Sequence, residues 1–444
     1  MTLRRNQLAA LAAAIERARR FDMPADATLS AFFREHAEIG AHDRAMVSDG
    51  VFAYLRRKAS LEALAQTDDP RLLAYAVQVR EFRHSVREIE PAINASDARW
   101  LAGFKSRMHE PLAPAVAADV PDWLWHRLGE TFDDASRAAL TRSWQSPAPL
   151  DLRVNIMKTT REAALEALTA EGLQVTKTPY APNGLRIDGR PSLSRHPWLV
   201  DGRLEVQDEG SQLVGLLVAP RRSDMVVDFC AGSGGKTLLL GAMMRSQGRL
   251  YAFDTLAKRL QRLTPRLARS GLSNVHPQVI AHERDAKVKR LAGKIDRVLV
   301  DAPCTGFGTL RRNPDLKWRQ TPEDVVELTA KQTRILDAAA TLLKPGGRLV
   351  YATCSVLPEE NDGIIDAFLE RHDSFKECDV AAQLSRAGVA LDTGSRLRLL
   401  PHLHGCDGFF AAILERAAVS VQDVEATEAS THERGMNVDM DGAA

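Results

Sequence analysis

Two cysteines and an aspartate stand where apolar, strand-like segments of this sequence end. Cys354 follows shortly after the apolar residues 349–351, and Asp301 and Cys304 follow a second apolar segment, residues 298–300. Ligand sites in open α/β sheets lie beyond the carboxyl ends of the strands, so we expect these three side chains to share one crevice. Two thiols beside a carboxylate could carry out nucleophilic catalysis, because a thiolate readily forms a covalent intermediate.

A single free cysteine is by default a small, buried apolar residue without reactivity. Both cysteines here have small polar neighbours, Pro-Cys-Thr around Cys304 and Thr-Cys-Ser around Cys354, where a packing cysteine would have a continuous apolar context. This setting at the end of a strand favours a reactive thiol over a packing role.

A glycine-rich turn at residues 228–237, with the sequence DFCAGSGGKT, follows a third strand-like segment. Such a turn lets the backbone approach a ligand closely, and the helix after it offers free N–H groups. A phosphate-binding P-loop would need glycine at Cys230, and the dinucleotide fingerprint would need glycine at Thr237, so both patterns fail. S-adenosylmethionine (SAM) remains as the ligand. The residues of the turn that are expected to bind it are Cys230, Ala231, Gly232, Ser233, Gly234, Gly235 and Lys236.

Acids follow the next three strand-like segments in turn. Asp254, after the predicted strand 250–253, is placed to hold the ribose hydroxyls of SAM. Asp285, after the predicted strand 275–280, is placed to reach the adenine amino group. Asp301 follows the predicted strand 295–300 and is also expected at the cofactor. Each acid singly could be a helix cap or a turn residue. Acids at three successive strand ends favour a cofactor site instead.

The elements that would position these residues divide the chain into four parts. Residues 206–417 alternate between strands and helices, which predicts βαβ units in a doubly wound α/β domain with a parallel sheet. Residues 1–142 contain only helical patterns, including helices at 7–21 and 45–64. Residues 143–205 predict a small α+β domain with strands at 150–154 and 173–178 and a helix at 160–171 capped by Thr159. Residues 418–444 form an acidic tail with little to bury, which predicts disorder.

Within residues 206–417 the apolar pattern predicts strands and helices in alternation. The predicted strands are 226–229, 250–253, 275–280, 295–300 and 349–352, and the predicted helices are 236–244, 256–270 and 321–343. The long helix has apolar residues on one face, which is typical of a helix that packs on a sheet.

The composition excludes several classes of protein. No run of eighteen apolar residues occurs, which excludes a membrane span. Five cysteines without a CxxC pair argue against a disulfide framework and against a structural zinc site. We therefore expect a cytoplasmic monomer without a bound metal. The net charge of +1 conceals a basic folded body, because the tail from Asp423 onward is acidic and has Arg434 as its only arginine or lysine.

Four motifs together resemble the Sun/Nop family of RNA 5-methylcytosine methyltransferases. They are DFCAGSGGKT, VDAPCTGFG with RRNPDLKW, YATCSVLPEEND and HGCDGFFAAILER. The match covers about residues 150–416, and the pairing of DAPC with TCS is highly specific. It implies a class I, Rossmann-like, SAM-dependent methyltransferase domain. The N-terminal helices resemble, more weakly, the NusB-like RNA-binding domain of the bacterial RsmB-like rRNA members. Cys406 departs from the family pattern, which has threonine there, outside the catalytic motifs.

The resemblance also implies a role for each residue of the predicted site. Cys354 would add to carbon 6 of cytosine, which makes carbon 5 able to take a methyl group. Cys304 would assist proton removal and product release, and Asp301 would hydrogen-bond N3 and the amino group of the base. Lys236 is the candidate for stabilising the thiolate, because an unperturbed cysteine is mostly protonated at neutral pH. The reverse assignment, with the Pro-Cys thiol as nucleophile as in DNA cytosine methylation, stays open.

Cations beside the catalytic loop predict an RNA contact, since phosphate neutralisation supplies most non-specific affinity. They are Arg311, Arg312, Lys317 and Arg319. A solvated loop is the alternative. The NusB-like start favours small-subunit rRNA as substrate, and tRNA is the alternative RNA. A small-molecule methyltransferase would not need DAPC with TCS or a helical domain, and a non-catalytic RNA-binding assembly factor would not need both thiols and the cofactor acids.

Overall fold

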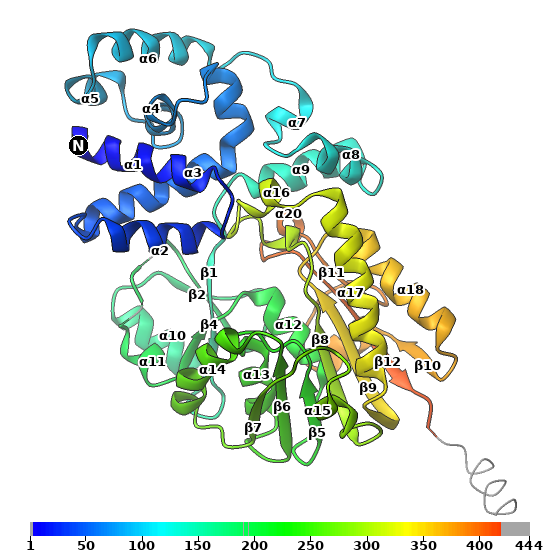
Figure 1. Ribbon diagram of the computed structural model, residues 1–444. Helices are drawn as coiled ribbons and strands as arrows, with labels where there is room; N and C mark the ends of the chain where they lie inside the picture. Colours follow the sequence, from blue (N-terminus) through cyan, green and yellow to red (C-terminus); the bar gives the residue numbers. More distant parts are fainter. Residues whose placement is uncertain (1–2, 190, 194, 419–444) are drawn as a thin grey trace, which may run out of the picture.

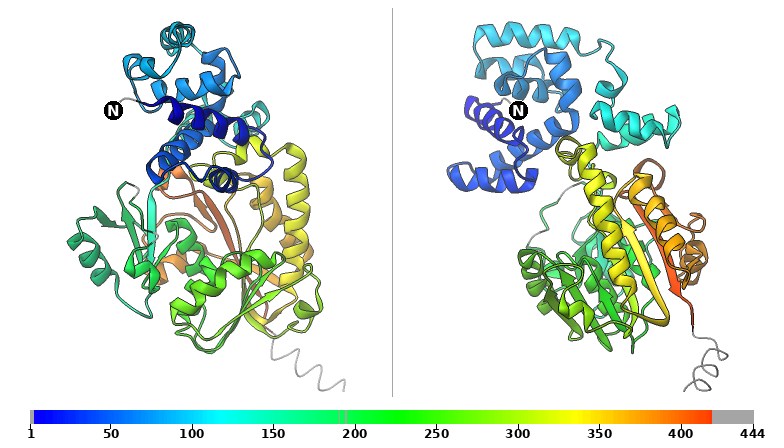
Figure 2. Two further views of the ribbon diagram at one scale, coloured as in Figure 1. Left: turned by 60° about the vertical axis from the view of Figure 1, so that its left-hand side comes forward. Right: turned by 45° about the vertical axis from the view of Figure 1, so that its right-hand side comes forward.

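The structure, a computed structural model, describes residues 3–189, 191–193 and 195–418. The predicted acidic tail lies outside the described residues, apart from its first residue. Within the described part of the chain, no helix is both long and apolar enough to cross a membrane. Figures 1 and 2 show a helical body stacked on a larger α/β body, with a small sheet beside it.

Six helices pack around a hydrophobic core at the N-terminal end of the chain. The apolar residues Val47, Val51, Tyr54 and Leu55 recur at helical spacing, and all four are buried on α3. The predicted helices at 7–21 and 45–64 correspond to α1 and α3. The elements of this body are α1 (Arg5–Ala18), α2 (Ala25–Glu35), α3 (Ala41–Ala65), α4 (Pro70–Arg80), α5 (Val86–Ile89), the 3-10 turn η1 (Glu90–Ala92) and α6 (Ala95–Arg107).

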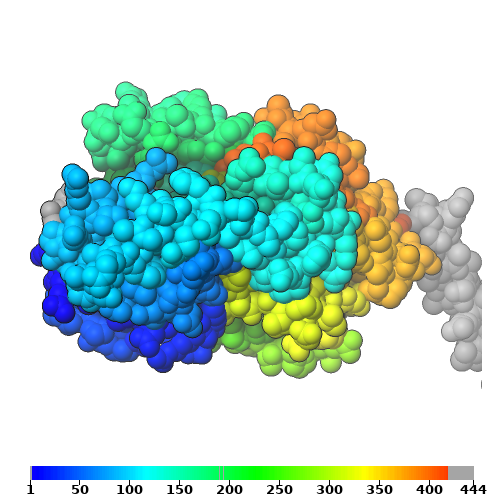
Figure 3. Space-filling model, turned by 90° about the horizontal axis from the view of Figure 1, so that it is seen from above, coloured from blue at the N-terminus to red at the C-terminus, as the bar shows by residue number. Residues whose placement is uncertain are grey.

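Three further helices do not join that core. They are α7 (Pro114–Ala117), α8 (Asp122–Gly129) and α9 (Asp134–Trp144). Leu124, Leu128 and Trp144 pack instead with Phe307 and Leu310, which belong to the loop after strand β8 (Ile295–Asp301). Figure 3 shows this cyan segment lying against the yellow part of the chain. The predicted helical domain thus includes helices that pack as a support for the predicted catalytic loop.

A four-stranded antiparallel sheet follows, with the strand order β2-β3-β1-β4. Its elements are β1 (Leu150–Val154), α10 (Arg161–Ala170), β2 (Val175–Lys177), β3 (Gly184–Ile187), α11 (Pro197–Val200) and β4 (Leu204–Val206). The sequence predicts β1, α10 and β2, but not β3 or β4, which are too short to show a period. The cap of α10 is Thr160 and not Thr159, because the Thr160 side chain accepts a hydrogen bond from the backbone N–H of Ala163.

The rest of the chain is built on an eight-stranded sheet with the order β10-β12-β9-β8-β5-β6-β7, and β11 pairs with β12 outside this path. The strands β5 to β9 run parallel, and β12 is antiparallel to β9. The other strands are β5 (Met225–Asp228), β6 (Arg249–Asp254), β7 (Val275–Val279), β9 (Leu343–Thr353), β10 (Phe375–Cys378), β11 (Leu397–Leu399) and β12 (Phe409–Arg416). The helices are α12 (Glu209–Val218), α13 (Gly235–Met243), α14 (Ala257–Ser270), α15 (Ala286–Lys289), α16 (Leu316–Arg319), α17 (Pro322–Ala340), α18 (Asp362–Arg371), α19 (Val380–Arg386) and α20 (Pro401–His404), with the 3-10 turns η2 (Phe307–Thr309) and η3 (Pro358–Glu360).

Helices cover both faces of this sheet. Val226 of β5 shares a core with apolar residues of α12, α13 and α14, whereas its neighbour Val227 shares one with α17 and α18. Successive residues of a strand point to opposite faces, so a strand that is covered on both faces needs a continuous apolar run. The predicted doubly wound α/β fold is therefore confirmed. The carboxyl ends of β5, β6, β8 and β9 meet along one edge of the sheet, where a ligand site is expected.

Candidate active site

The two cysteines singled out in the sequence lie side by side at the ends of neighbouring strands. Cys304 comes shortly after β8 and Cys354 directly after β9, and their Sγ atoms are 3.4 Å apart. β8 and β9 are hydrogen-bonded as parallel neighbours, which brings the two loops together. One cavity of about 640 Å³ is lined by both thiols, by Asp301 and by the turn around Gly232.

Close main-chain contacts hold the loops that carry the thiols. The N–H of Gly308 donates to the carbonyl of Cys354 at 2.8 Å, and the N–H of Gly408 donates to the carbonyl of Gly308 at 2.8 Å. A Cβ atom on Gly308 would lie 2.1 Å from the carbonyl oxygen of Gly408. This approach requires glycine at position 308, and it ties the HGCDGFF segment to both thiol loops.

A buried glutamate to which the sequence analysis gave no role, Glu360, joins the same two loops. Its carboxylate accepts hydrogen bonds from the backbone N–H of Thr305 at 2.9 Å, from the Thr305 hydroxyl at 2.6 Å and from the hydroxyl of Ser355. The side-chain amide of Gln332 in α17 donates to it at 3.0 Å. Because Thr305 and Ser355 each follow a thiol directly, one carboxylate spans the two loops. Burial raises the pKa of Glu360 against the effect of these donors.

An ion pair between a buried lysine and a half-buried aspartate also belongs to the cavity. The ammonium of Lys236 donates to Asp301 Oδ2 at 2.7 Å and lies 5.1 Å from the ring centroid of Phe409. Burial by itself lowers the pKa of Lys236, but the negative charges of Asp301 and of a Cys354 thiolate outweigh it, so the pKa is raised. The lysine therefore stays charged, and it stabilises negative charge in the cavity.

The glycine-rich turn forms another wall of the cavity. Gly232 has a φ of 57° and open space where a Cβ atom would be, so a ligand can approach its backbone. The carboxylate of Asp254 accepts hydrogen bonds from the N–H of Gly232 at 2.9 Å and of Leu256 at 2.7 Å. Gly234 is not among the described residues that line the cavity; a Cβ atom there would lie 2.2 Å from the side chain of Leu263. The other residues of the turn that are predicted to bind SAM line the cavity: Cys230, Ala231, Ser233, Gly235 and Lys236.

Asp228, at the end of β5, lines the cavity and is not among the predicted site residues. One of its oxygens accepts a hydrogen bond from the Thr237 hydroxyl at 2.7 Å, and the other has no hydrogen-bond partner among the described residues. Burial raises the pKa of Asp228 to about 7. A free buried acceptor beside a glycine-rich turn fits a ligand that carries an ammonium group, as SAM does.

Asp285 lies apart from this arrangement. Its carboxylate accepts hydrogen bonds from the N–H groups of Lys287 and Ala281, both at 2.8 Å, and it caps α15. Among the described residues that line the cavity are Ile280 and Glu283 from this segment, but not Asp285. The predicted adenine contact of Asp285 stays a prediction, and within the described chain the carboxylate serves as a helix cap.

Lys317, one of the cations predicted to contact RNA, joins the helical body to the catalytic part instead. Helix α3 breaks at Arg57, where φ is −113° and ψ is 16°. At the break the ammonium of Lys317 donates to the carbonyl of Arg56 at 3.0 Å, and the indole N–H of Trp318 donates to that of Leu55 at 2.8 Å. Lys317 is only 1% exposed, so an RNA phosphate cannot reach it. Burial lowers its pKa to about 7.

The other three predicted RNA contacts also have partners in the described chain. Arg312 donates to Asp208 at 2.8 Å and to Asp407 at 2.6 Å. Arg311 donates to the carbonyl groups of residues 147 and 405 at 3.1 and 3.2 Å. Arg319 pairs at 3.4 Å with the aspartate four residues before it. An RNA phosphate would have to compete with these internal partners.

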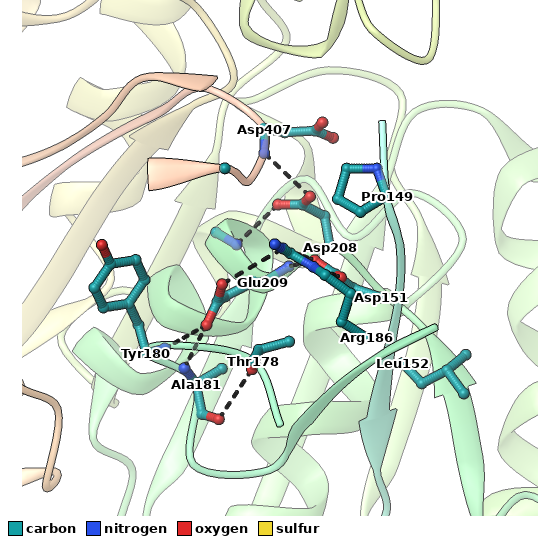
Figure 4. A network of polar contacts seen from close by, with 12 residues as sticks. Pro149, Asp151, Leu152, Thr178, Tyr180, Ala181, Arg186, Asp208, Glu209 and Asp407 are labelled. Carbon is teal, nitrogen blue, oxygen red and sulfur yellow. Dashed lines mark hydrogen bonds and ion pairs between the residues drawn. The ribbon is translucent and has the colours of Figure 1, made fainter. Parts of the chain in front are cut away.

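The acids that hold Arg312 border a buried network between the small sheet and the catalytic part (Figure 4). Arg186 of β3 donates to both oxygens of Asp151 at 2.7 and 2.9 Å and lies 3.7 Å from Glu209. Glu209 accepts hydrogen bonds from the backbone N–H groups of residues 180 and 181. Asp208 accepts one from the N–H of Asp407 at 3.1 Å. The segment that contains Arg312 is thus part of the joint between domains.

The fold and the cavity together define a class I methyltransferase with a two-cysteine site. A family model for the 16S rRNA methyltransferases RsmB/F matches residues 215–415, and a model for the ferredoxin-like domain of the RsmF/B-like methyltransferases matches residues 120–194. A probable ribosomal RNA small subunit methyltransferase B from Synechocystis sp. is 36% identical over 67% of this chain and 67% of its own. A ribosomal RNA small subunit methyltransferase B from Erwinia tasmaniensis is 36% identical over 76% and 71% of the two chains. The chain belongs to the RsmB/F family of 16S rRNA methyltransferases.

Solved structures resemble the described chain over most of its length. The crystal structure of PH0851 covers 94% of this chain and 100% of its own with a TM-score of 0.75 and 25% identity. NSun6 from Pyrococcus horikoshii, solved with SFG, covers 67% of this chain and 99% of its own with a TM-score of 0.60, and at 21% identity it shows a shared fold. The resemblance to the Sun/Nop family is confirmed. The roles of single residues stay predictions. Among the described residues, no group of three or more His, Cys, Asp or Glu side chains is arranged to hold a metal ion.

Proposed function

We propose that this protein transfers the methyl group of SAM to carbon 5 of a cytosine in small-subunit rRNA, acting as a monomer in the cytoplasm. The observation that carries the proposal is the 3.4 Å separation of the Cys304 and Cys354 sulfurs in a cavity that also reaches the glycine-rich turn. Relatives named as rRNA small subunit methyltransferases B support rRNA as the substrate.

The two thiols differ in a way that supports Cys354 as the nucleophile. The hydrogen bond with Cys354 and burial raise the pKa of Cys304 well above its ordinary value, so Cys304 keeps its proton and donates it to the other sulfur. Cys354 then accepts that hydrogen bond, and the charged Lys236 attracts its thiolate. Cys304 therefore serves as the proton donor of the pair, and Cys354 as the nucleophile.

In the proposed reaction, the Cys354 thiolate forms a bond to carbon 6, and the electron pair moves toward N3 of the ring. The Cys304 proton passes to N3, where the Asp301 carboxylate accepts the resulting N–H as a hydrogen bond. Carbon 5 is now an enamine carbon and can attack a methyl electrophile. SAM supplies that electrophilic methyl group when bound, and its sulfonium becomes a neutral thioether.

Release of the product returns both thiols to their starting state. The Cys304 thiolate takes the proton from carbon 5, the C5=C6 double bond forms again, and the bond from carbon 6 to the Cys354 sulfur breaks. The N3 proton then leaves to solvent, so one proton is released for each methyl group transferred. A cysteine that is a strong base once deprotonated is suited to this step, which agrees with the raised pKa of Cys304.

Substitution of each cysteine tests these roles. We expect Cys354→Ala to abolish both methyl transfer and covalent trapping of RNA, and Cys304→Ala to accumulate a stalled protein–RNA adduct. A gel-shift assay under denaturing conditions with radiolabelled SAM measures both. Equal trapping by the two variants would show that the roles are misassigned.

The substrate is tested separately. Bisulfite sequencing of total RNA from a strain that lacks the gene should show one 5-methylcytosine lost from small-subunit rRNA. Loss of a tRNA methylcytosine instead would move the enzyme to the tRNA alternative. Absence of any lost site, together with no methyl transfer in vitro to RNA, protein or nucleosides, would favour a non-catalytic assembly factor.

A further inference from the structure

Helix α14, beside the mouth of the cavity, is strongly basic and contains no acid. Leu260 and Leu263 bury one face of the helix in the core under the sheet. The opposite face carries the cations Lys258, Arg259, Arg262, Arg266 and Arg269. The helix therefore presents a charged face whose partners need to be identified.

Among the described residues, side-chain partners are found only for the C-terminal half of this charged face. Arg266 donates to Glu205 at 2.8 Å and Arg269 donates to the same carboxylate at 3.1 Å. The side chains of Arg259 and Arg262 are exposed, line the cavity, and have no hydrogen-bond or ion-pair partner within the described chain. Two guanidinium groups are thus left for an anion that comes from outside the protein.

A third unpartnered cation lines the cavity from the other side of the sheet. Lys331 of α17 is exposed and, like the two arginines, its side chain has no hydrogen-bond or ion-pair partner among the residues that the structure describes. α14 packs in the core on one face of the sheet and α17 in the core on the other, as their places in Figure 1 also show. Free positive charge therefore flanks the mouth of the cavity on both sides.

We propose that Arg259 and Arg262, with Lys331 opposite them, bind the RNA phosphates next to the target cytosine; the inference rests on the proposed function. A cytosine that reaches the cavity has to be turned out of its stack, and its own phosphates then lie at the rim. Phosphates at a rim are held by unpaired cations. The cations at 311–319 have internal partners, whereas the side chains of Arg259 and Arg262 have none among the described residues.

The charges of SAM do not call for two further arginines at the cavity. SAM itself carries two positive groups, a sulfonium and an ammonium, and one negative carboxylate. The acids Asp228 and Asp254 line the part of the cavity beside the glycine-rich turn. The positive charge of Arg259, Arg262 and Lys331 at the mouth of the cavity would repel a ligand with a net positive charge weakly and would attract a polyanion. The charge of the rim is therefore complementary to RNA.

Charge reversal tests the proposal on the full chain. The variant is Arg259→Glu/Arg262→Glu, with Arg259→Gln/Arg262→Gln as a milder form in case the reversal disturbs folding. The matched control is Lys376→Glu/Arg386→Glu, two exposed cations that are not among the described residues lining the cavity. The affinity for a single-stranded rRNA fragment is measured between 50 and 200 mM salt, and SAM affinity is measured by calorimetry.

Loss of two phosphate contacts should flatten the slope of log affinity against log salt by about 1.4 to 1.8. Over this fourfold range of salt, the unaltered protein and the control would then lose about 7 to 12 times more affinity than the variant. SAM affinity should not change. An unchanged slope in both variants overturns the proposal, and a loss of SAM affinity with an unchanged slope assigns the arginines to the cofactor. Failure of the proposed function would appear separately, as absence of methyl transfer by the unaltered protein. The salt slopes would still show whether Arg259 and Arg262 contact RNA.

Discussion

Replacement of Glu360 by alanine is expected to impair catalysis by releasing the two thiol loops from each other. The side chain is fully buried and is the common acceptor for donors on both loops, the N–H and hydroxyl of Thr305 and the hydroxyl of Ser355. Gln332 holds the same carboxylate from α17. Glu360 is not among the described residues that line the cavity, so it acts through the positions of the thiols and is a positioning residue.

The magnitude follows from the donors that Glu360→Ala leaves behind. The buried N–H of Thr305 loses its acceptor, which costs about 1–3 kcal/mol, and the empty space adds about 1–2 kcal/mol. The hydroxyls of Thr305 and Ser355 are 3.2 Å apart and can bond to each other. We expect a loss of about 2–5 kcal/mol in the free energy of unfolding. A shift of about 1 Å between the thiols would lower the methylation rate about 100-fold.

Glu360→Gln is the matched control. The amide oxygen still accepts from the Thr305 N–H, its NH₂ group donates to the two hydroxyls, and a buried charge disappears, so stability should stay within about 1 kcal/mol of the unaltered protein. Because the pKa of Glu360 is raised in the folded state, folding takes up a proton above pH 4.5. The stability of the unaltered protein should therefore fall relative to Glu360→Gln as the pH rises from 4.5 through the raised pKa.

Urea denaturation at several pH values and single-turnover methylation of RNA measure both effects. The expected result is a stable, active glutamine variant and a destabilised, slow alanine variant. If Glu360→Ala methylates at the normal rate, the two loops do not depend on this carboxylate. If Glu360→Gln is as slow as Glu360→Ala with normal stability, the charge acts in the chemistry itself and the positioning role is wrong.

Three further predictions concern buried charges. Lys236→Met should slow single-turnover methyl transfer, because Asp301 loses the ammonium that pairs with it at 2.7 Å; an unchanged rate would contradict the electrostatic role of Lys236. For Lys317, whose pKa falls from 10.5 to about 7 on burial, the unfolded chain binds more protons between those values, so stability should rise with pH there and Lys317→Met should remove the rise in urea melts. For Asp228, with a pKa raised to about 7, SAM affinity should increase as the pH rises from 6 to 8, and Asp228→Asn should flatten this dependence in calorimetry.

The central strands could be predicted because burial on both faces makes them continuous apolar runs. β5, β8 and the end of β9 read in this way, and the residues that follow them could be placed at one edge of the sheet without knowledge of any contact. β3 and β4 could not be predicted, because a strand of three or four residues that includes polar side chains is too short to show an alternating apolar pattern. Glu360 was also missed, because its function depends on how the loop after β9 turns back on Thr305, and local sequence does not determine that turn.

The cations illustrate a different limit, since a sequence shows charge but not its partner. Arg312 and Lys317 stand beside the catalytic loop, yet an acid pair and a broken helix from distant parts of the chain already hold them. Arg259 and Arg262 lie far from the thiols in sequence, and the sheet brings them to the cavity without partners. An arginine that already binds a buried carboxylate gives up that contact to bind RNA, whereas a free one loses only water. The proposed RNA contact at α14 would therefore cost less than one at the catalytic loop, although arginine and lysine are frequent in both segments.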